Sequence, residues 1–304
     1  MIEDNIHKQL RCQYNPDGSL LRDLQLRMLE ILKCIDSICE KHSIKYWLSS
    51  GTLLGAVRHG GFIPWDDDVD IEMLREDYLK LMEILPKELP EQYVLQNNET
   101  DSNYVYLYAK VRDRNSFIEE RCLVNKTFNE RGVFVDIFML EKSFLFLNKI
   151  SAPLFNRMLF GMALEEGIFK YVYKANRLVL LQILFPFFRF LSHFSSSKSL
   201  RHTFGVNFFK ERSYNDIFPL RKIEFEGVLL NVPFDCDAYL MKLFGNYMEL
   251  PEKIETHIEN YGNNGKGPVW WYPREKMYSA DNCPSSAELE KLKVNLLKTL
   301  VEML

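Results

Sequence analysis

The sequence lacks the features that mark several common classes of protein. Its six cysteines are scattered and contain no CxxC pair, so they indicate neither a zinc site nor a disulfide framework, and we expect reduced thiols. The formal net charge is −4, without the basic excess that is typical of nucleic-acid-binding proteins. We therefore expect no nucleic-acid partner. No internal repeat or low-complexity linker is visible either.

Targeting and membrane-spanning patterns are also missing. Residues Met1–Ser19 are polar and do not have the charged-then-apolar layout of a signal peptide. The most apolar run, Leu178–Leu191, is interrupted by Pro186 and Arg189 and is shorter than the ~20 apolar residues that a spanning helix needs. We therefore expect no spanning helix and a cytoplasmic protein.

What is present is an ordinary globular mixture of 47% hydrophobic and 26% charged residues in 304 positions, which fits a core with an added subdomain. Periodicity and turn residues predict helices over 20–43, 52–58, 76–85, 238–244 and 287–304, with Pro86 ending the third. They predict strands over 45–49, 69–73, 93–96, 105–112, 117–120 and 133–140, and a hairpin over 222–232 that turns near Gly227.

The composition changes along the chain and suggests three segments. We expect a catalytic core over 1–142, a helical insertion over 143–220 and a C-terminal block over 221–304 that completes the core. The insertion is apolar and edged with Lys and Arg. Such a stretch is typical either of a helical subdomain packed on the core or of a helix on a membrane surface, and both interpretations remain open.

Four acids stand close together at Asp66, Asp67, Asp68 and Asp70. If 69–73 is a strand, its side chains alternate between faces, so Asp68 and Asp70 share one face. Two carboxylates at this spacing can hold a hard cation. Two such charges ~4 Å apart repel by ~1 kcal/mol in water and ~4 kcal/mol near a protein surface. A bound cation would offset this electrostatic repulsion.

Two other interpretations of this cluster need to be weighed. A solvated acidic turn is possible. A calcium loop fails, because the position that requires glycine holds Ile71 and the position that requires a bidentate glutamate holds Asp77.

A glycine turn precedes the acids at Ser50, Gly51 and Thr52. A turn that opens a helix presents backbone N–H groups to a phosphate. Downstream, Asp136 lies in an apolar strand, where a charge is expensive unless it is paired or bound to a metal. It is therefore the expected third carboxylate, the alternative being a buried aspartate bonded to backbone or arginine.

Basic residues supply candidate phosphate ligands. Lys110 and Arg112 alternate onto one face of a strand and could each pair with a phosphate oxygen, the alternative being surface charge. Arg58 is a further candidate, whereas the adjacent His59 is expected to be an ordinary loop residue.

The segment SSGTLLGAVRHGGFIPWDDDVDI, at 49–71, closely resembles the signature of the LicD family, which also includes the fukutin-type proteins. Three further segments resemble parts of the family: YAKVRDRNS at 108–116, GVFVDIF at 132–138 and EFEGVLLNVPFDCDAYLMKLFGNYMELP at 224–251. The resemblance implies an α/β (α+β) protein with a nucleotidyltransferase-type mixed sheet flanked by helices and an inserted helical subdomain. The loop 55–65 is absent from most nucleotidyltransferases but typical of this family.

The resemblance also implies an activity. Family members transfer a phospho-alcohol from a CDP-activated donor to a sugar hydroxyl and release CMP. Phosphocholine from CDP-choline, transferred to lipopolysaccharide, teichoic acid or capsule, is the first expectation, and CDP-ribitol or CDP-glycerol is the alternative donor. Expected partners are the donor, a glycan or lipid-linked glycan acceptor, and a peripheral contact with the inner face of the cytoplasmic membrane.

Matched to the family pattern, Asp68, Asp70 and Asp136 become the catalytic and metal-binding residues, with Mg²⁺ or Mn²⁺ as the cofactor. The expected substrate-binding residues are Ser50, Gly51, Thr52, Arg58, Lys110 and Arg112. A quaternary ammonium needs an aromatic box, for which Trp47, Trp65, Trp270, Trp271 and Tyr272 are candidates by residue type alone. Two other function classes stay open: a true nucleotidyltransferase that releases pyrophosphate, and a non-catalytic metal-binding scaffold.

Overall fold

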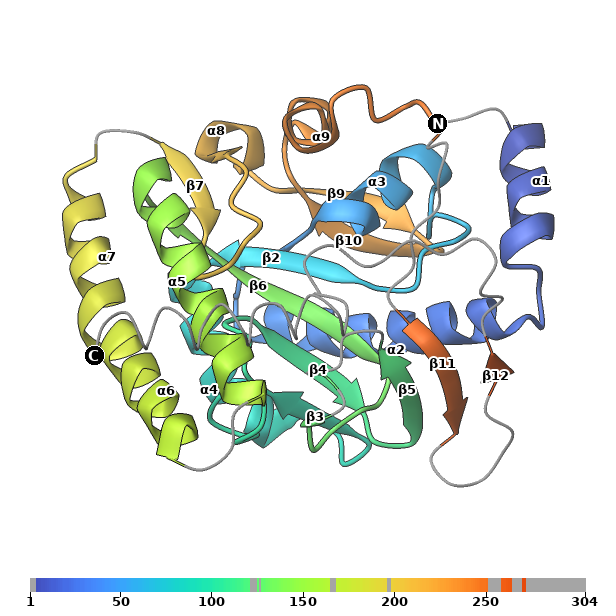
Figure 1. Ribbon diagram of the computed structural model, residues 1–304. Helices are drawn as coiled ribbons and strands as arrows, with labels where there is room; N and C mark the ends of the chain where they lie inside the picture. The colour runs from blue at the N-terminus through green and yellow to red at the C-terminus, as the bar shows by residue number, and fades with distance from the viewer. Residues whose placement is uncertain are drawn as a thin grey trace.

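Strands rich in β-branched and aromatic residues form a curled, mixed sheet at the centre of the molecule (Figure 1). The structure, a computed structural model, describes residues 4–120, 125, 127–164, 168–195, 198–250, 258–263 and 270–271. In sheet order the strands are β1 (Trp47–Leu48), β2 (Asp70–Leu74), β6 (Phe134–Lys142), β4 (Ala109–Asp113) and β3 (Tyr93–Gln96), with β7 (Ser199–His202) on β6 and β8 (Arg212–Ser213) on β7.

The long strand β6 organises this sheet. It runs parallel to β2, with Asp70 opposite Asp136, and antiparallel to β4 and β7. Leu140 pairs with β2 on one side and with β7 on the other, so β7 occupies the edge of β6 that β4 leaves uncovered. The mixed sheet that was expected is therefore confirmed.

Helices cover the sheet. Helix α2 (Leu20–Lys41) follows the N-cap residue Ser19, whose side chain accepts a hydrogen bond from Arg22 N–H. Its buried stripe recurs every three or four residues, as the sequence predicts. The remaining helices of this part are α1 (Asp4–Tyr14), α3 (Ser50–His59), α4 (Arg75–Glu88), α8 (Tyr214–Ile217) and α9 (Cys236–Phe244).

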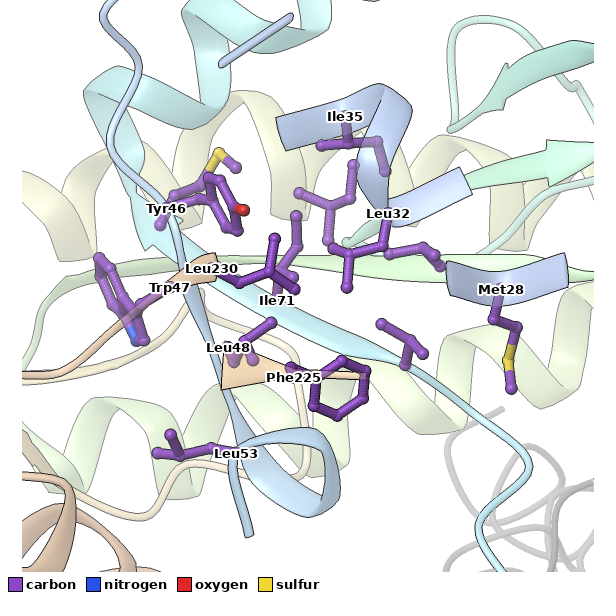
Figure 2. Close-up of a cluster of buried hydrophobic side chains, with 14 of the residues drawn as sticks. Met28, Leu32, Ile35, Tyr46, Trp47, Leu48, Leu53, Ile71, Phe225 and Leu230 are labelled. Carbon is purple, nitrogen blue, oxygen red and sulfur yellow. The ribbon is translucent and has the colours of Figure 1, made fainter. Parts of the chain in front are cut away.

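The main hydrophobic core joins segments that are far apart in the sequence. Figure 2 shows Leu32 and Ile35 of α2 together with Leu48, Ile71 and Phe225 in one buried cluster. Phe225 belongs to the expected hairpin, formed by β9 (Arg221–Phe225) and β10 (Val228–Val232). The C-terminal block is thereby packed into the same core as the first strands.

A second, smaller sheet lies beside the main one. It consists of β5 (Ser116–Glu120), β11 (Ile258–Asn263) and β12 (Trp270–Trp271). The helix that the sequence predicts over 287–304 lies outside the described residues.

The helical insertion forms a layer of its own at the left of Figure 1. It contains α5 (Leu145–Leu164), α6 (Ile168–Val179), the π-helical turn η2 (Leu180–Leu184) and α7 (Phe185–His193). A second hydrophobic cluster, which includes Phe155, Phe185 and Phe204, holds it against the rest of the molecule. The chain then rejoins the central sheet at β7, inside the segment 143–220 that the sequence assigned to the insertion.

Two prolines do not end helices where the sequence predicts. Helix α4 continues through Pro86 to Glu88, because Leu89 N–H closes the last turn onto Leu85 O at 3.0 Å. Pro186 follows the π-helical turn and sits in the first turn of α7, where a missing backbone N–H removes little.

As a result, Tyr171–His193 is one helix that is long and apolar enough to cross a membrane, and it is the only such helix in the described part of the chain. The expectation that the apolar run is too short and too interrupted is wrong, because Pro186 does not interrupt it. Only 17% of its apolar window is buried, whereas a core helix that meets the same criterion is mostly buried. Length and composition do not by themselves distinguish a span from a helix on a surface.

The strand predicted over 105–112 is shorter in the structure. Only Ala109–Asp113 is extended in the sheet, because its partner β3 ends at Gln96 and offers no backbone groups to the preceding residues.

Candidate active site

The glycine turn and the acidic segment meet at the end of β1. Ser49 N–H donates to Asp70 O at 3.1 Å, and Asp70 N–H donates to Thr52 Oγ1 at 2.9 Å. Ser50 has a positive φ of 47° where α3 begins. A β-carbon on Gly51 would lie 3.0 Å from Asp66 Oδ2, so glycine lets this carboxylate approach the start of the helix closely.

The side chains of residues 66–70 alternate between half-buried and buried positions, as the sequence predicts. Asp66, Asp68 and Asp70 are half-buried, whereas Asp67 and Val69 between them are buried. Asp68 precedes the first residue of β2, so the alternation begins before the strand does. Asp66 Oδ2 is buried and accepts no hydrogen bond from the described residues.

The parallel pairing of β2 and β6 brings the third acid to the same place. Asp136 lies opposite Asp70, and its N–H donates to Val69 O at 2.8 Å. On the neighbouring strand β4, Lys110 pairs with Asp136, and its Nζ lies 2.7 Å from Asp136 Oδ1. The structure therefore brings together the glycine turn, Asp68, Asp70, Asp136 and Lys110, one of the three expected basic residues.

Mutual repulsion shapes the protonation of this cluster. Burial raises the pKa of Asp70, and the charges of Asp68 and Asp136 raise it further. Burial raises the pKa of Asp136 to about 6, although Lys110 opposes the shift. Burial, followed by the charges of Asp68, Asp67 and Asp70, raises the pKa of Asp66. The site thus carries more negative charge than its own cations neutralise.

Oxygen donors of this kind suit a hard divalent cation. Among the described residues, however, no three His, Cys, Asp or Glu side chains are positioned as a finished metal-ion site. The donor chemistry and the excess charge therefore fit Mg²⁺ or Mn²⁺, and the cation itself stays a prediction.

The expected basic residues occupy different surroundings. Arg112 shares the Lys110 face of β4, but it is fully buried and donates to Gln96, Gly132 O and Glu120. Its positive charge is thus already paired within the protein, and its place in substrate binding stays a prediction.

Arg58 is also buried, in a different part of the site. It donates to Tyr247 O at 2.8 Å and to Glu249 O at 3.2 Å, so it ties α3 to the segment after α9. Its Nε donates to His59 Nε2 at 3.0 Å, and burial followed by the Arg58 charge lowers the pKa of His59 to about 3. His59 is therefore a neutral, buried neighbour of Arg58.

Sequence reasoning missed Glu72, which is fully buried two residues after Asp70. Its carboxylate lies 2.5 Å from Arg212 Nη2 and 2.8 Å from His202 Nε2, and it accepts a 2.5 Å hydrogen bond from Tyr239 OH. Burial alone would raise the pKa of Glu72, but Arg212 and the hydrogen bonds outweigh it and lower the pKa. The alternation of acids at 68, 70 and 72 was the one signal for it.

Residues of α2 and of the β9–β10 hairpin hold the loop 60–66 in place. Glu226, in the hairpin turn, accepts from Phe62 N–H at 3.1 Å and pairs with Arg22 of α2 at 2.6 Å. Gln25, also on α2, donates to Asp66 O at 2.9 Å. The family-typical loop is therefore an ordered part of the site.

Of the five candidates for an aromatic box, the two whose side chains the structure describes are buried. Trp47 is fully buried and donates to Glu72, and Trp65 is buried against Tyr14. The side chains of Trp270 and Trp271 and the whole of Tyr272 lie outside the described residues.

Two tyrosines that the sequence did not single out lie beside the cluster instead. The rings of Tyr106 and Tyr108 are partly exposed and stack with centroids 5.1 Å apart. Lys110 Nζ lies 5.5 Å from the centroid of Tyr108, and burial followed by the charge of Asp136 raises the pKa of Tyr108.

Comparisons with known proteins agree with this geometry. Residues 43–153 match the family model described as "LicD/FKTN/FKRP, nucleotidyltransferase domain". The lipopolysaccharide cholinephosphotransferase LicD of Haemophilus influenzae is 36% identical over 122 residues, which are 40% of this chain and 44% of that protein. The ribitol 5-phosphate transferase FKRP of Homo sapiens is 46% identical over 48 residues, 16% of this chain and 10% of that protein.

An uncharacterized protein of Rickettsia prowazekii is 50% identical over 62 residues, 20% of this chain and 23% of that protein. The chain thus spans less than half the length of these relatives. The matched family segment nevertheless contains the glycine turn, all four clustered acids and Asp136. Residues 43–153 of this chain are thus similar to the nucleotidyltransferase domain of the LicD/FKTN/FKRP family.

Proposed function

We propose that this protein transfers a phospho-alcohol, phosphocholine first, from a CDP-activated donor to a hydroxyl of a cell-surface glycan and releases CMP. The observation that carries the proposal is the meeting of the α3 N-terminus with Asp68, Asp70 and Asp136. Similarity to a cholinephosphotransferase supports the choice of phosphocholine. A glycan acceptor and a cytoplasmic location are parts of the proposal.

In this reaction, the acceptor oxygen attacks the phosphorus that carries the alcohol, and the bond from that phosphorus to the CMP oxygen breaks. Backbone N–H groups at the start of α3, around Gly51 and Thr52, bind the donor phosphates. Asp136, with a pKa of about 6, is mostly ionised at neutral pH and accepts the proton of the attacking hydroxyl. Lys110 positions the Asp136 carboxylate, with Nζ 2.7 Å from Oδ1.

Asp68 and Asp70 would hold the divalent cation, and Asp136 would join them only when it is not serving as the base, because one carboxylate cannot be a tight ligand and a free base at once. When bound, Mg²⁺ or Mn²⁺ would neutralise the diphosphate and the leaving CMP oxygen.

The first experiment is a donor panel with product analysis. Purified protein is incubated with CDP-choline, CDP-ribitol or CDP-glycerol, with Mg²⁺ or Mn²⁺, and with a glycan acceptor. Release of CMP supports the proposal. Release of pyrophosphate from a nucleoside triphosphate would instead identify a true nucleotidyltransferase, and the absence of any donor binding would leave a non-catalytic scaffold. Full turnover in excess EDTA would exclude a role for the cation.

Replacing one acid separates function from folding. Asp70→Asn should abolish CMP release, while its unfolding midpoint in the absence of metal stays equal or rises, because the variant removes repulsion that raises the pKa of Asp70. The exposed Asp17→Asn is the matched control and should behave as the wild type. An Asp70→Asn protein with full activity would remove this residue from the mechanism.

Tyr106 and Tyr108 offer a test of which alcohol the donor carries. We expect the stacked rings of Tyr106 and Tyr108 to bind a trimethylammonium group, since such cations lie over ring faces with about 0.5–2 kcal/mol of attraction. Tyr108→Leu should raise KM for CDP-choline roughly 2- to 30-fold, and Tyr108→Phe should not. An equal effect on CDP-ribitol would show that the ring does not recognise choline.

CDP-ribitol is the second candidate donor. The similarity to a ribitol 5-phosphate transferase favours it, although that similarity covers a shorter stretch than the similarity to the cholinephosphotransferase. Preference for CDP-ribitol in the donor panel would establish it.

A further inference from the structure

The outer face of the helix Tyr171–His193 carries large apolar side chains over its whole length, and Lys174, Asn176, Gln182 and His193 are exposed among them. The large apolar side chains recur every three or four residues from Val179 on and continue onto the next residue, Phe194. They are Tyr171, Val172, Leu178, Val179, Ile183, Phe187, Phe190 and Phe194. We call these eight residues the outer stripe.

The inner face of the same helix is apolar as well. Phe185 and Phe188 are buried against Phe204, with ring centroids 6.0 Å and 5.4 Å away. Large apolar side chains on a helix are normally covered, by protein or by lipid. Here the protein encloses one side only, and α6 and α7 lie at the edge of the molecule (Figure 1).

The charged side chains within the three helices of this region are all basic. Helices α5, α6 and α7 contain six Lys or Arg residues and no Asp or Glu, although the whole chain has a net charge of −4. Glu165 and Glu166, between α5 and α6, lie outside the described residues. Lys149, Arg157 and Lys174 are exposed. A basic, apolar surface is complementary to a bilayer with anionic headgroups.

The inner contacts determine how the helix would meet the bilayer. Arg189 pairs with Glu141 at 2.6 Å and donates to Thr203 at 3.0 Å, and Arg177 donates to Asn98. These bonds fix the helix along its length to the folded core. A helix fixed in this way lies in the membrane interface and does not cross it.

We propose that the outer stripe docks this protein on the surface of an anionic membrane, with α6 and α7 lying in the interface and neighbouring Lys and Arg residues on lipid headgroups. The proposal is independent of the transfer reaction. It supplies a reason for the exposed aromatic residues that the fold itself does not use.

The test is flotation of the purified full-length protein with vesicles, without nucleotide or acceptor. Vesicles of phosphatidylcholine alone are compared with vesicles that also contain phosphatidylglycerol. We expect stronger binding to the anionic vesicles and a loss of that difference at high salt. The double variant Ile183→Glu/Phe187→Glu should bind at least about tenfold more weakly.

Leu229→Glu/Phe234→Glu is the matched control. These residues, in and just after β10, are exposed by 61% and 55%, against 64% and 53% for Ile183 and Phe187. All four are on the surface, so both variants should keep the wild-type unfolding midpoint. Lys174→Glu should weaken only the binding that depends on phosphatidylglycerol.

Three outcomes would overturn the proposal. The first is a wild type that floats with neither kind of vesicle, and the second is a control variant that loses as much binding as the stripe variant. The third is a wild-type dimer in light scattering that Ile183→Glu/Phe187→Glu converts to a monomer, which would make the stripe a contact between two copies. A protein that binds vesicles but transfers nothing would contradict the proposed function alone.

Discussion

Single glycines decide how closely the parts of this site approach one another. At Gly51 the nearest obstacle to a β-carbon is a side chain, the carboxylate of Asp66 at 3.0 Å. At Gly55 the obstacles are backbone atoms, Gly61 O at 2.5 Å and Ile63 N at 3.0 Å. A side chain can move aside more easily than backbone can. We therefore expect Gly51 to matter for activity and Gly55 to matter for stability.

Alanine at these two positions should therefore separate activity from stability. Gly51→Ala should keep its unfolding midpoint, because alanine favours a helix by up to ~1 kcal/mol, but should lower transfer by up to about 100-fold through a displaced Asp66. Gly55→Ala should lower the free energy of unfolding by about 1–3 kcal/mol. Urea unfolding measures the free energy of unfolding, and CMP release measures the transfer activity. Equal loss of stability in the two variants would contradict this division.

At the same scale, the sequence revealed the acids but not their partners. Asp68, Asp70 and Asp136 could be predicted because alternation and an apolar strand are local patterns. The pairing of Lys110 with Asp136 could not, since it depends on the antiparallel register of β4 and β6. The enclosure of Arg112 depends in turn on Glu120 of β5.

At the scale of elements, strand β2 is fixed by a buried charge network as well as by its backbone. Glu72 connects it to Arg212 of β8 and to Tyr239 of α9, and Tyr239 OH lies 3.0 Å from Ser49 Oγ in the turn before α3. The chain order gives no hint of this meeting, because the partners follow Glu72 by more than a hundred residues. Local patterns predict elements but not their contacts.

Removing the charge of Glu72 should destabilise this whole arrangement. Glu72→Gln leaves Arg212 buried without its counter-charge, for which a loss of about 3–5 kcal/mol in the free energy of unfolding is expected. Arg212→Met should cost a similar amount. The double variant should lose clearly less than the sum of the two, because neither charge is then left alone. Strict additivity in urea unfolding would mean that the pair does not act as a unit.

At the scale of the whole molecule, the residues that the structure describes form two hydrophobic cores. The larger joins α2, the central sheet and the hairpin, and the smaller joins α5 and α7 to residues near Phe204. The sequence predicted the change of character near 143 from composition. It could not predict that β7 extends the sheet, because a strand of four residues carries too little pattern.

Two cores predict two levels of stability. Phe185→Ala opens a cavity in the smaller core, with an expected local loss of about 3–5 kcal/mol, whereas Leu32→Ala opens one in the larger core. Phe185→Ala should increase the rate of amide hydrogen exchange in α5–α7 and leave the amides of β2 and β6 protected. Leu32→Ala should increase the exchange rate of the β2 and β6 amides as well, because the central sheet packs against α2. If Phe185→Ala exposes β2 and β6 equally, the insertion and the core unfold as one unit, and the site depends on the helical layer for its stability.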